Sequence, residues 1–173
     1  MKKLVMALVA MFSLSTVAEA QITVDLSSYE GKYFTCQHPA DFEADDDPVI
    51  ATLFEAEMDD THHMQISLND VTIASAQEFK EWTKNNQNNA TVFLGEPTGW
   101  KVDEPVIKGM SMTMRRVKEQ EINEEKVMMC IYEFAKVSPK SKKLFAGEIH
   151  FPLSDESTYK PLIDRIVDSL KEK

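Results

Sequence analysis

The sequence contains little glycine, little cysteine and few cations for its length. It has five glycines, two cysteines and 19 lysines plus arginines against 29 acidic residues in 173. No glycine-rich phosphate loop is present, and no serine or cysteine stands in the sequence pattern of a hydrolase nucleophile. We therefore predict no cofactor. The formal charge of −10 leaves no basic surface for nucleic acid, whose phosphates dominate binding, and predicts that the protein avoids anionic membranes.

Only one long run of hydrophobic residues occurs, at the start of the chain. Two lysines precede the apolar stretch 4–14, and small residues close the segment at Ala20. This order is typical of a cleavable secretory signal peptide, and the stretch is too short to span a bilayer as a mature helix. A membrane anchor is the alternative. We expect residues 1–20 to be removed and the mature chain, starting near Gln21, to be soluble in the periplasm or outside the cell.

Residues 21–173 show no internal repeat, no proline-rich linker and no abrupt change of composition. A chain of roughly 150 residues buries most of its surface in one core without metals or multiple disulfides. We therefore predict a single domain over 21–173.

The two cysteines, Cys36 and Cys130, have two interpretations. An oxidising compartment allows them to pair, and closing a loop of this length would stabilise the fold by about 4–5 kcal/mol in the chain-entropy model. In the alternative, each is a small buried hydrophobic residue on its own strand. The sequence gives no distance between them, so both interpretations stay open.

Hydrophobic periodicity predicts strands, a helix, further strands and a terminal helix. Ser75 and Glu78 have the spacing of a capping box, so a helix is expected to begin there. A second amphipathic helix is expected over 158–170, with Pro161 in its first turn. β-branched and apolar segments bounded by turn residues predict the strands. These strands cover residues 33–36, 49–57, 63–68, 91–94, 107–117, 126–137 and 143–151.

The strand predicted over 126–137 carries apolar residues at both its odd and its even positions, so both of its faces are apolar. It should therefore be central and covered on both faces. Charged turns flank it at 119–125 and 138–141, which indicates sequential antiparallel neighbours. We predict an α+β fold, an antiparallel sheet covered by helices on both faces in an α/β/α sandwich.

Three segments carry a resemblance to a known family. They are the opening Tyr33-Phe34-Thr35-Cys36-Gln37-His38-Pro39, the helix start Ser75-Ala76-Gln77-Glu78-Phe79, and the closing strand 145–151 that runs into 159–170. In this order of elements the chain resembles the PsbP-like superfamily over nearly all of residues 21–173. The resemblance implies an α/β/α sandwich that acts as a non-enzymatic binding module for protein partners, and it assigns no catalytic role to any residue.

Three methionines alternate along one predicted strand. Met110, Met112 and Met114 would place three thioethers on one face, because side chains of a strand alternate. In an exported protein clustered thioethers can select Cu(I). The alternative is that the methionines fill an irregular core beneath a helix.

Aspartate and histidine gather at a predicted turn. Asp59, Asp60, His62 and His63 stand just before or within a strand. Adjacent histidines of a strand point to opposite faces, so at most one can join the aspartates in a metal site. A solvated turn is the alternative.

His150 and Glu148 share one face of the last long strand, where a histidine beside a carboxylate can act as a general base. No activated nucleophile accompanies them. We therefore predict a non-enzymatic module that binds a protein partner through a sheet edge or an exposed helix face. A basic partner surface would fit its charge. A periplasmic metal-handling protein is the alternative, followed by a small hydrolase.

Overall fold

The computed structural model describes residues 24–45, 50, 52–87 and 99–173. The predicted signal peptide 1–20 and the predicted strand 91–94 lie outside these residues. The following description concerns the described ranges alone.

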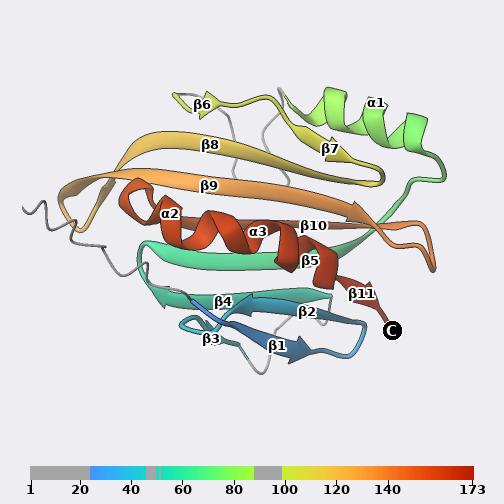
Figure 1. Ribbon diagram of the computed structural model, residues 1–173, viewed down its shortest axis with the longest axis horizontal. Helices are drawn as coiled ribbons and strands as arrows, with labels where there is room; N and C mark the ends of the chain where they lie inside the picture. The colour runs from blue at the N-terminus through green and yellow to red at the C-terminus, as the bar shows by residue number, and fades with distance from the viewer. Residues whose placement is uncertain (1–23, 46–49, 51, 88–98) are drawn as a thin grey trace, which may run out of the picture.

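An antiparallel sheet of eight described strands forms the body of the molecule (Figure 1). Seven of its strands follow one another across the sheet, and the remaining one, β7, pairs with β8 beside β6. In spatial order the seven are β3 (Glu43–Ala44), β4 (Leu53–Asp59), β5 (His62–Thr72), β10 (Lys143–Pro152), β9 (Glu125–Val137), β8 (Ser111–Ile122) and β6 (Lys101–Val102), and β7 is Val106–Lys108. The prediction of an α+β fold with an antiparallel sheet is confirmed.

A smaller sheet packs beside the large one. It contains β1 (Leu26–Glu30), β2 (Phe34–Pro39) and β11 (Lys171–Glu172), in the order β1-β2-β11. The strand β1 was not predicted from the sequence. It pairs antiparallel with β2 over its whole length, from Leu26 opposite Pro39 to Glu30 opposite Thr35.

The helix α1 (Ala76–Gln87) begins where the capping box predicts. The Glu78 backbone N–H donates to Ser75 Oγ at 3.2 Å, and the Ala74 N–H donates to Glu78 Oε2 at 2.9 Å. The carboxylate therefore reaches one residue further back than in the usual capping box, and two donors of the first turn region are satisfied.

The prediction of one continuous terminal helix is wrong. Three short segments replace it after the single turn η1 (Leu153–Asp155): α2 (Glu156–Tyr159), η2 (Lys160–Leu162) and α3 (Ile163–Ser169). Pro161 lies in the tighter turn η2. Proline has no backbone N–H to donate and its ring crowds the preceding turn, so the α-helical hydrogen bonding breaks there.

Buried side chains form two clusters, which separate according to side-chain parity in the central strand β9. Phe134 belongs to the first cluster and Ala135 to the second. The first cluster contains Ile163, Ile166 and Val167 of α3, which lies in front of β9 and β10 in Figure 1. The second cluster contains Phe79 of α1 with Met112, Met114, Ala135, Val137, Leu144 and Ile73.

In the part of the chain that the structure describes, no helix combines the length and the apolar character needed to cross a bilayer.

Candidate functional site

Polar side chains stand in line across four neighbouring strands on the face of the sheet that carries the second cluster. Glu133 of β9 is opposite Glu148 of β10, Glu148 is opposite Gln65 of β5, and Gln65 is opposite Glu55 of β4. Directly opposed residues of antiparallel strands project to the same side. We call these four residues, together with Arg116 of β8, the charged row.

Most of the charged row is buried. The exposed fractions are 1% for Arg116, 4% for Glu133 and 2% for Glu148. Arg116 Nε lies 3.0 Å from Glu133 Oε2. On the other side, Gln65 Nε2 donates to Glu148 Oε1 at 2.7 Å. Buried charges of this kind cost several kcal/mol each unless they are paired, so Arg116 and Gln65 hold two glutamates that would otherwise repel each other.

Some buried atoms of the charged row have no hydrogen-bond partner among the described residues, among them Glu148 Oε2 and Arg116 Nη2. Native proteins leave few buried polar atoms in this condition. A concentration of buried charge with unused donor and acceptor atoms is a common property of functional sites.

Two histidines lie beside the charged row. His150 is opposite His63, and their ring centroids are 5.7 Å apart in an edge-on arrangement. His150 Nε2 lies 3.1 Å from Glu148 Oε1. Burial lowers the pKa of His63, and the nearby His150 lowers it further, while the carboxylates of Glu148, Glu55 and Glu57 act in the opposite direction. His63 therefore favours its neutral form.

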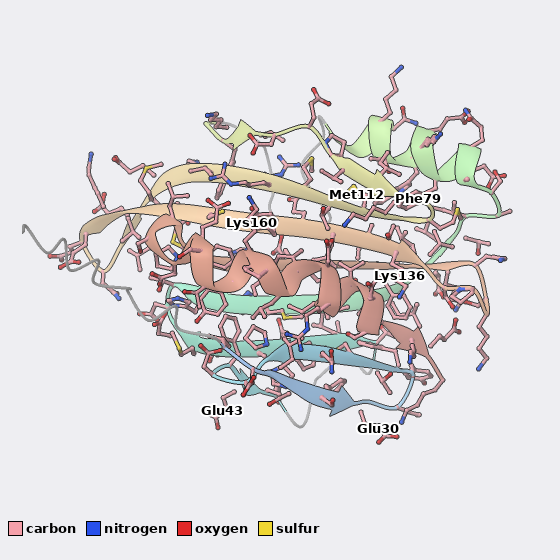
Figure 2. The ribbon with its side chains drawn as sticks, in the orientation of Figure 1. Glu30, Glu43, Phe79, Met112, Lys136 and Lys160 are labelled. Carbon is pink, nitrogen blue, oxygen red and sulfur yellow. The ribbon has the colours of Figure 1, made fainter. Side chains whose placement is uncertain are left out.

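The charged row ends at an open cleft of about 550 Å³ at the β3–β4 edge of the sheet. We call it the acidic cleft. Four carboxylates and one imidazole dominate its lining, and Figure 2 shows Glu43 at the outer side of the molecule. The lining residues are Glu43, Ala44, Asp45, Glu55, Ala56, Glu57 and His63. Such a lining suits a cationic group, which would reduce the mutual repulsion of the carboxylates.

The methionines occupy the position that the packing alternative predicts. Met112 and Met114 are buried with Phe79 in the second cluster, and Met110 packs against its margin. Figure 2 shows Phe79 of α1 next to Met112. Their alternation places these side chains on one face, and Cu(I) binding there stays a prediction.

The two adjacent histidines lie in different surroundings, as expected from their adjacency in a strand. His63 faces the acidic cleft, whereas His62 packs against the rings of Phe42 and Tyr159. His62 Nδ1 lies 3.0 Å from Asp59 Oδ1, and its Nε2 lies 3.1 Å from Asp155 Oδ2. Asp155 is far away in the sequence, so sequence reasoning missed it.

Asp59 is fixed by its own turn. Burial alone would raise its pKa, but hydrogen bonds from Thr61 and His62 outweigh this and hold the pKa well below its usual range. Within the described ranges, no three histidine, cysteine or acidic side chains converge closely enough to hold a metal ion. Of this cluster, His62 contacts Asp59 and the distant Asp155.

His150 and Glu148 lie together, as the spacing predicts, but they have no nucleophile. Glu148 is buried, and the hydrogen bonds of the described residues give His150 no serine, threonine or cysteine partner. The geometry gives the hydrolase alternative no support.

The two cysteines are buried in the first cluster, on β2 and β9, and both thiols are free in the structure. Burial raises the pKa of Cys36 to about 12 and that of Cys130 to about 11. Such thiols react slowly, because the thiolate is the reactive form. A disulfide between them stays a prediction.

Sequence reasoning also missed Arg116, Glu133 and Gln65. A signal was present for Glu133, which is a charged residue in the middle of a strand that is apolar on both faces. Such a residue is rarely buried unless it is paired or functional. The pairing itself depends on strand register, which the sequence does not show.

Fold and site together define a class: an α+β module built on one large antiparallel sheet, with a buried charged row and an acidic cleft at one edge. The chain has the fold of the Ran-binding protein Mog1p of Saccharomyces cerevisiae. That likeness has a TM-score of 0.53 at 12% identity and covers 86% of this chain and 95% of that one.

Two further solved structures are similar. A substituted form of the protein Mog1 gives a TM-score of 0.50 at 12% identity, over 84% of this chain and 95% of that one. Cyanobacterial PsbP (CyanoP) from Synechocystis has a TM-score of 0.44 at 9% identity, and the likeness covers 92% of this chain and 99% of that one. At 12% identity, the likeness to Mog1p shows the fold alone.

No protein-family model matches the chain. No curated protein matches it by sequence.

Proposed function

We propose that this protein is an exported, non-enzymatic binding module that engages a protein partner in the cell envelope. The acidic cleft receives a basic segment of that partner. The observation that carries this proposal is the convergence of Glu43, Asp45, Glu55 and Glu57 on one cleft at a sheet edge.

Among the described residues, only a short part of the outer edge of β4 is paired. The neighbour of β4 on its outer side is the two-residue strand β3, which pairs only Glu43 with Glu57 and Ala44 with Ala56. One further backbone hydrogen bond joins Asp45 N–H to the Glu55 carbonyl at 2.9 Å. A sheet edge that is covered over so short a length is a common docking place for an extended peptide.

The charges at the cleft favour a basic partner. Lysine or arginine side chains entering the cleft would gain Coulomb energy from several carboxylates at once. Electrostatic complementarity of this kind increases the association rate and makes binding sensitive to salt.

The fold and the start of the chain support the other parts of the proposal. Mog1p is a Ran-binding protein, so this fold is used elsewhere for binding a protein. The charged, apolar and small-residue order of residues 1–20 supports export. The packing of Phe79 against the methionines of β8 supports a sandwich in which α1 covers part of the second face.

Crosslinked affinity isolation of residues 21–173 from the envelope fraction of its own cells tests the proposal. The double variant Glu55→Gln and Glu57→Gln removes two charges from the cleft. The matched control, Glu124→Gln and Glu125→Gln, removes two charges from the exposed β8–β9 turn.

A stoichiometric partner that is retained by the control and reduced at least about tenfold by the cleft variant supports the proposal, since each lost charge contact costs about 1 kcal/mol or more. Equal recovery of the partner by both variants contradicts the acidic cleft as its binding site. Recovery of the bait alone contradicts a stable protein partner.

A further inference from the structure

Four segments that are far apart in the sequence meet at one end of the molecule. They are residues 29–33, 69–74, 138–143 and 171–173. The Lys173 N–H donates to the Tyr33 carbonyl at 2.9 Å, and the Ile73 N–H donates to the Lys142 carbonyl at 2.9 Å. Ser138 Oγ donates to Glu172 Oε2 at 2.6 Å. Figure 1 shows this end, with the chain terminus and the β9–β10 turn, at the right of the longest axis. We call it the basic end.

The basic end has the opposite sign of charge to the rest of the protein. Its four segments hold six lysines and three acidic side chains, terminal groups aside, in a protein with a formal charge of −10. The lysines are Lys32, Lys140, Lys142, Lys143, Lys171 and Lys173. All but Lys143 are exposed residues.

Few of these lysines are neutralised. Lys143 Nζ lies 2.6 Å from Asp70 Oδ1, and Lys173 Nζ lies 3.0 Å from Glu30 Oε1. The third carboxylate, Glu172, accepts hydrogen bonds from Ser138 and Ser141. Within the described ranges, Lys32, Lys142 and Lys171 have no ion pair. Their charges are therefore available to an external anion.

The opposite end of the long axis is acidic. It is formed by the β4–β5 and β8–β9 turns, which Figure 1 shows at the left. Asn123 Nδ2 joins the two turns by donating to Asp60 Oδ2 at 2.8 Å. The acidic residues there include Asp60, Glu119, Glu121, Glu124 and Glu125. The molecule is thus polarised along its length, and an anionic surface would attract one end and repel the other.

An aromatic and an aliphatic side chain are exposed among the lysines. Tyr33 is 41% exposed and Val71 is 46% exposed. The Lys32 ammonium lies 5.2 Å from the centre of the Tyr33 ring. Tyrosine, with an apolar ring and a polar hydroxyl, is enriched at the level of lipid headgroups, and lysine extends its charge to phosphates over apolar surface.

We propose that the basic end binds the surface of an anionic phospholipid bilayer, so that the molecule stands on the membrane with its acidic end directed away. Lys32, Lys140 and Lys142 belong to exposed turns, which suits contact with a flat anionic surface. The overall charge predicts avoidance of such membranes, but screening over about 8 Å at physiological salt makes the nearest charges decisive. This surface is separate from the acidic cleft, so the two proposals stand or fall independently.

Co-sedimentation of residues 21–173 with lipid vesicles tests this inference. The vesicles contain either phosphatidylglycerol with phosphatidylethanolamine or phosphatidylcholine alone. The test variant is Lys140→Glu with Lys142→Glu. The matched control, Lys126→Glu with Lys160→Glu, makes the same change in net charge away from the basic end; Figure 2 labels Lys160 on the other half of the molecule.

We expect binding to the anionic vesicles alone and its loss at high salt. The test variant should lower the partition coefficient at least about tenfold, since each lysine near such a surface contributes about 1 kcal/mol, and the control should lower it less than about threefold. Absence of binding to anionic vesicles, or an equal loss in both variants, would overturn the inference. So would binding of the basic end to poly-L-glutamate without binding to vesicles, which would indicate an acidic protein partner.

Discussion

Arg116 and Glu133 lie inside the sheet, where an apolar pair of similar size would cost less to bury. Arg116 is 1% exposed, and its Nε lies 3.0 Å from Oε2 of Glu133 on the neighbouring strand. Removing such charges from water costs more free energy than an exposed ion pair contributes to stability. The arrangement therefore depends on all its members, and removal of one should leave the others unpaired.

The variant Arg116→Met should lower the free energy of unfolding by about 3–5 kcal/mol, because it leaves a buried carboxylate without its cation. Urea unfolding followed by circular dichroism measures the change. The double variant Arg116→Met with Glu133→Met should recover much of the loss. Lys126→Met, which removes an exposed ion pair with Glu119, should cost less than about 1 kcal/mol. A single variant as stable as this control would contradict a structural role for Arg116.

The protein should become less stable as the pH falls below about 6.5, in part because of His63. Its pKa in the folded state is lowered from 6.5, first by burial and then by His150. The unfolded state therefore takes up a proton at a higher pH than the folded state does. This contribution to stability is fully present above pH 6.5 and is lost as the pH falls toward the lowered pKa.

The variant His63→Gln should flatten the dependence of unfolding free energy on pH between about 6.5 and 5, because it removes one group with this difference in pKa. Urea unfolding at a series of pH values measures the slope. Some slope should remain, since burial also lowers the pKa of His38. An unchanged slope would mean that His63 protonates equally easily in both states.

At the scale of elements, a lysine side chain of the large sheet donates hydrogen bonds to the carbonyls at the end of α3. Lys136 of β9 donates from Nζ to the carbonyls of Val167 at 2.9 Å, Asp168 at 2.9 Å and Leu170 at 3.1 Å. The last carbonyls of a helix have no partner within the helix, and they favour a cation. Figure 2 shows Lys136 beside the end of α3. One lysine thus attaches the helix to the central strand.

Replacing Lys136 with methionine should destabilise the protein by about 1–3 kcal/mol, because three helix-end carbonyls lose their donor. Amide hydrogen exchange should show earlier opening of α3 than of β9 and β10. Lys142→Met, in the exposed β9–β10 turn, serves as the control and should stay within about 0.5 kcal/mol of the wild type. Unchanged protection of α3 in the Lys136 variant would show that its packing alone holds the helix.

At the scale of the whole molecule, one cysteine lies on the small sheet and one on the large sheet, and both are packed in the first cluster. Cys36 lies on β2 and Cys130 on β9, and both are free thiols. Thiol titration of mature protein purified without reductant should give slow labelling in the folded state, since burial raises both pKa values. Two thiols should become reactive on unfolding. No reactive thiol after unfolding would establish the alternative, a disulfide between them.

The sequence by itself determined the features that depend on near neighbours in the chain. The Ser75 and Glu78 spacing placed the start of α1, because a helix cap involves residues three or four apart. The two-sided apolar pattern of 126–137 identified the central strand β9, which lies between β8 and β10. Alternation in a strand also separated His62 from His63.

Only the tertiary structure decided how distant segments meet. Strand register set Glu133 against Glu148 and added Arg116. The packing of the terminal segment placed Asp155 beside His62, and the meeting of four segments made a basic end in an acidic protein. Contacts of this kind join residues that local periodicity treats as independent, because their separation in the chain carries no information about register or docking.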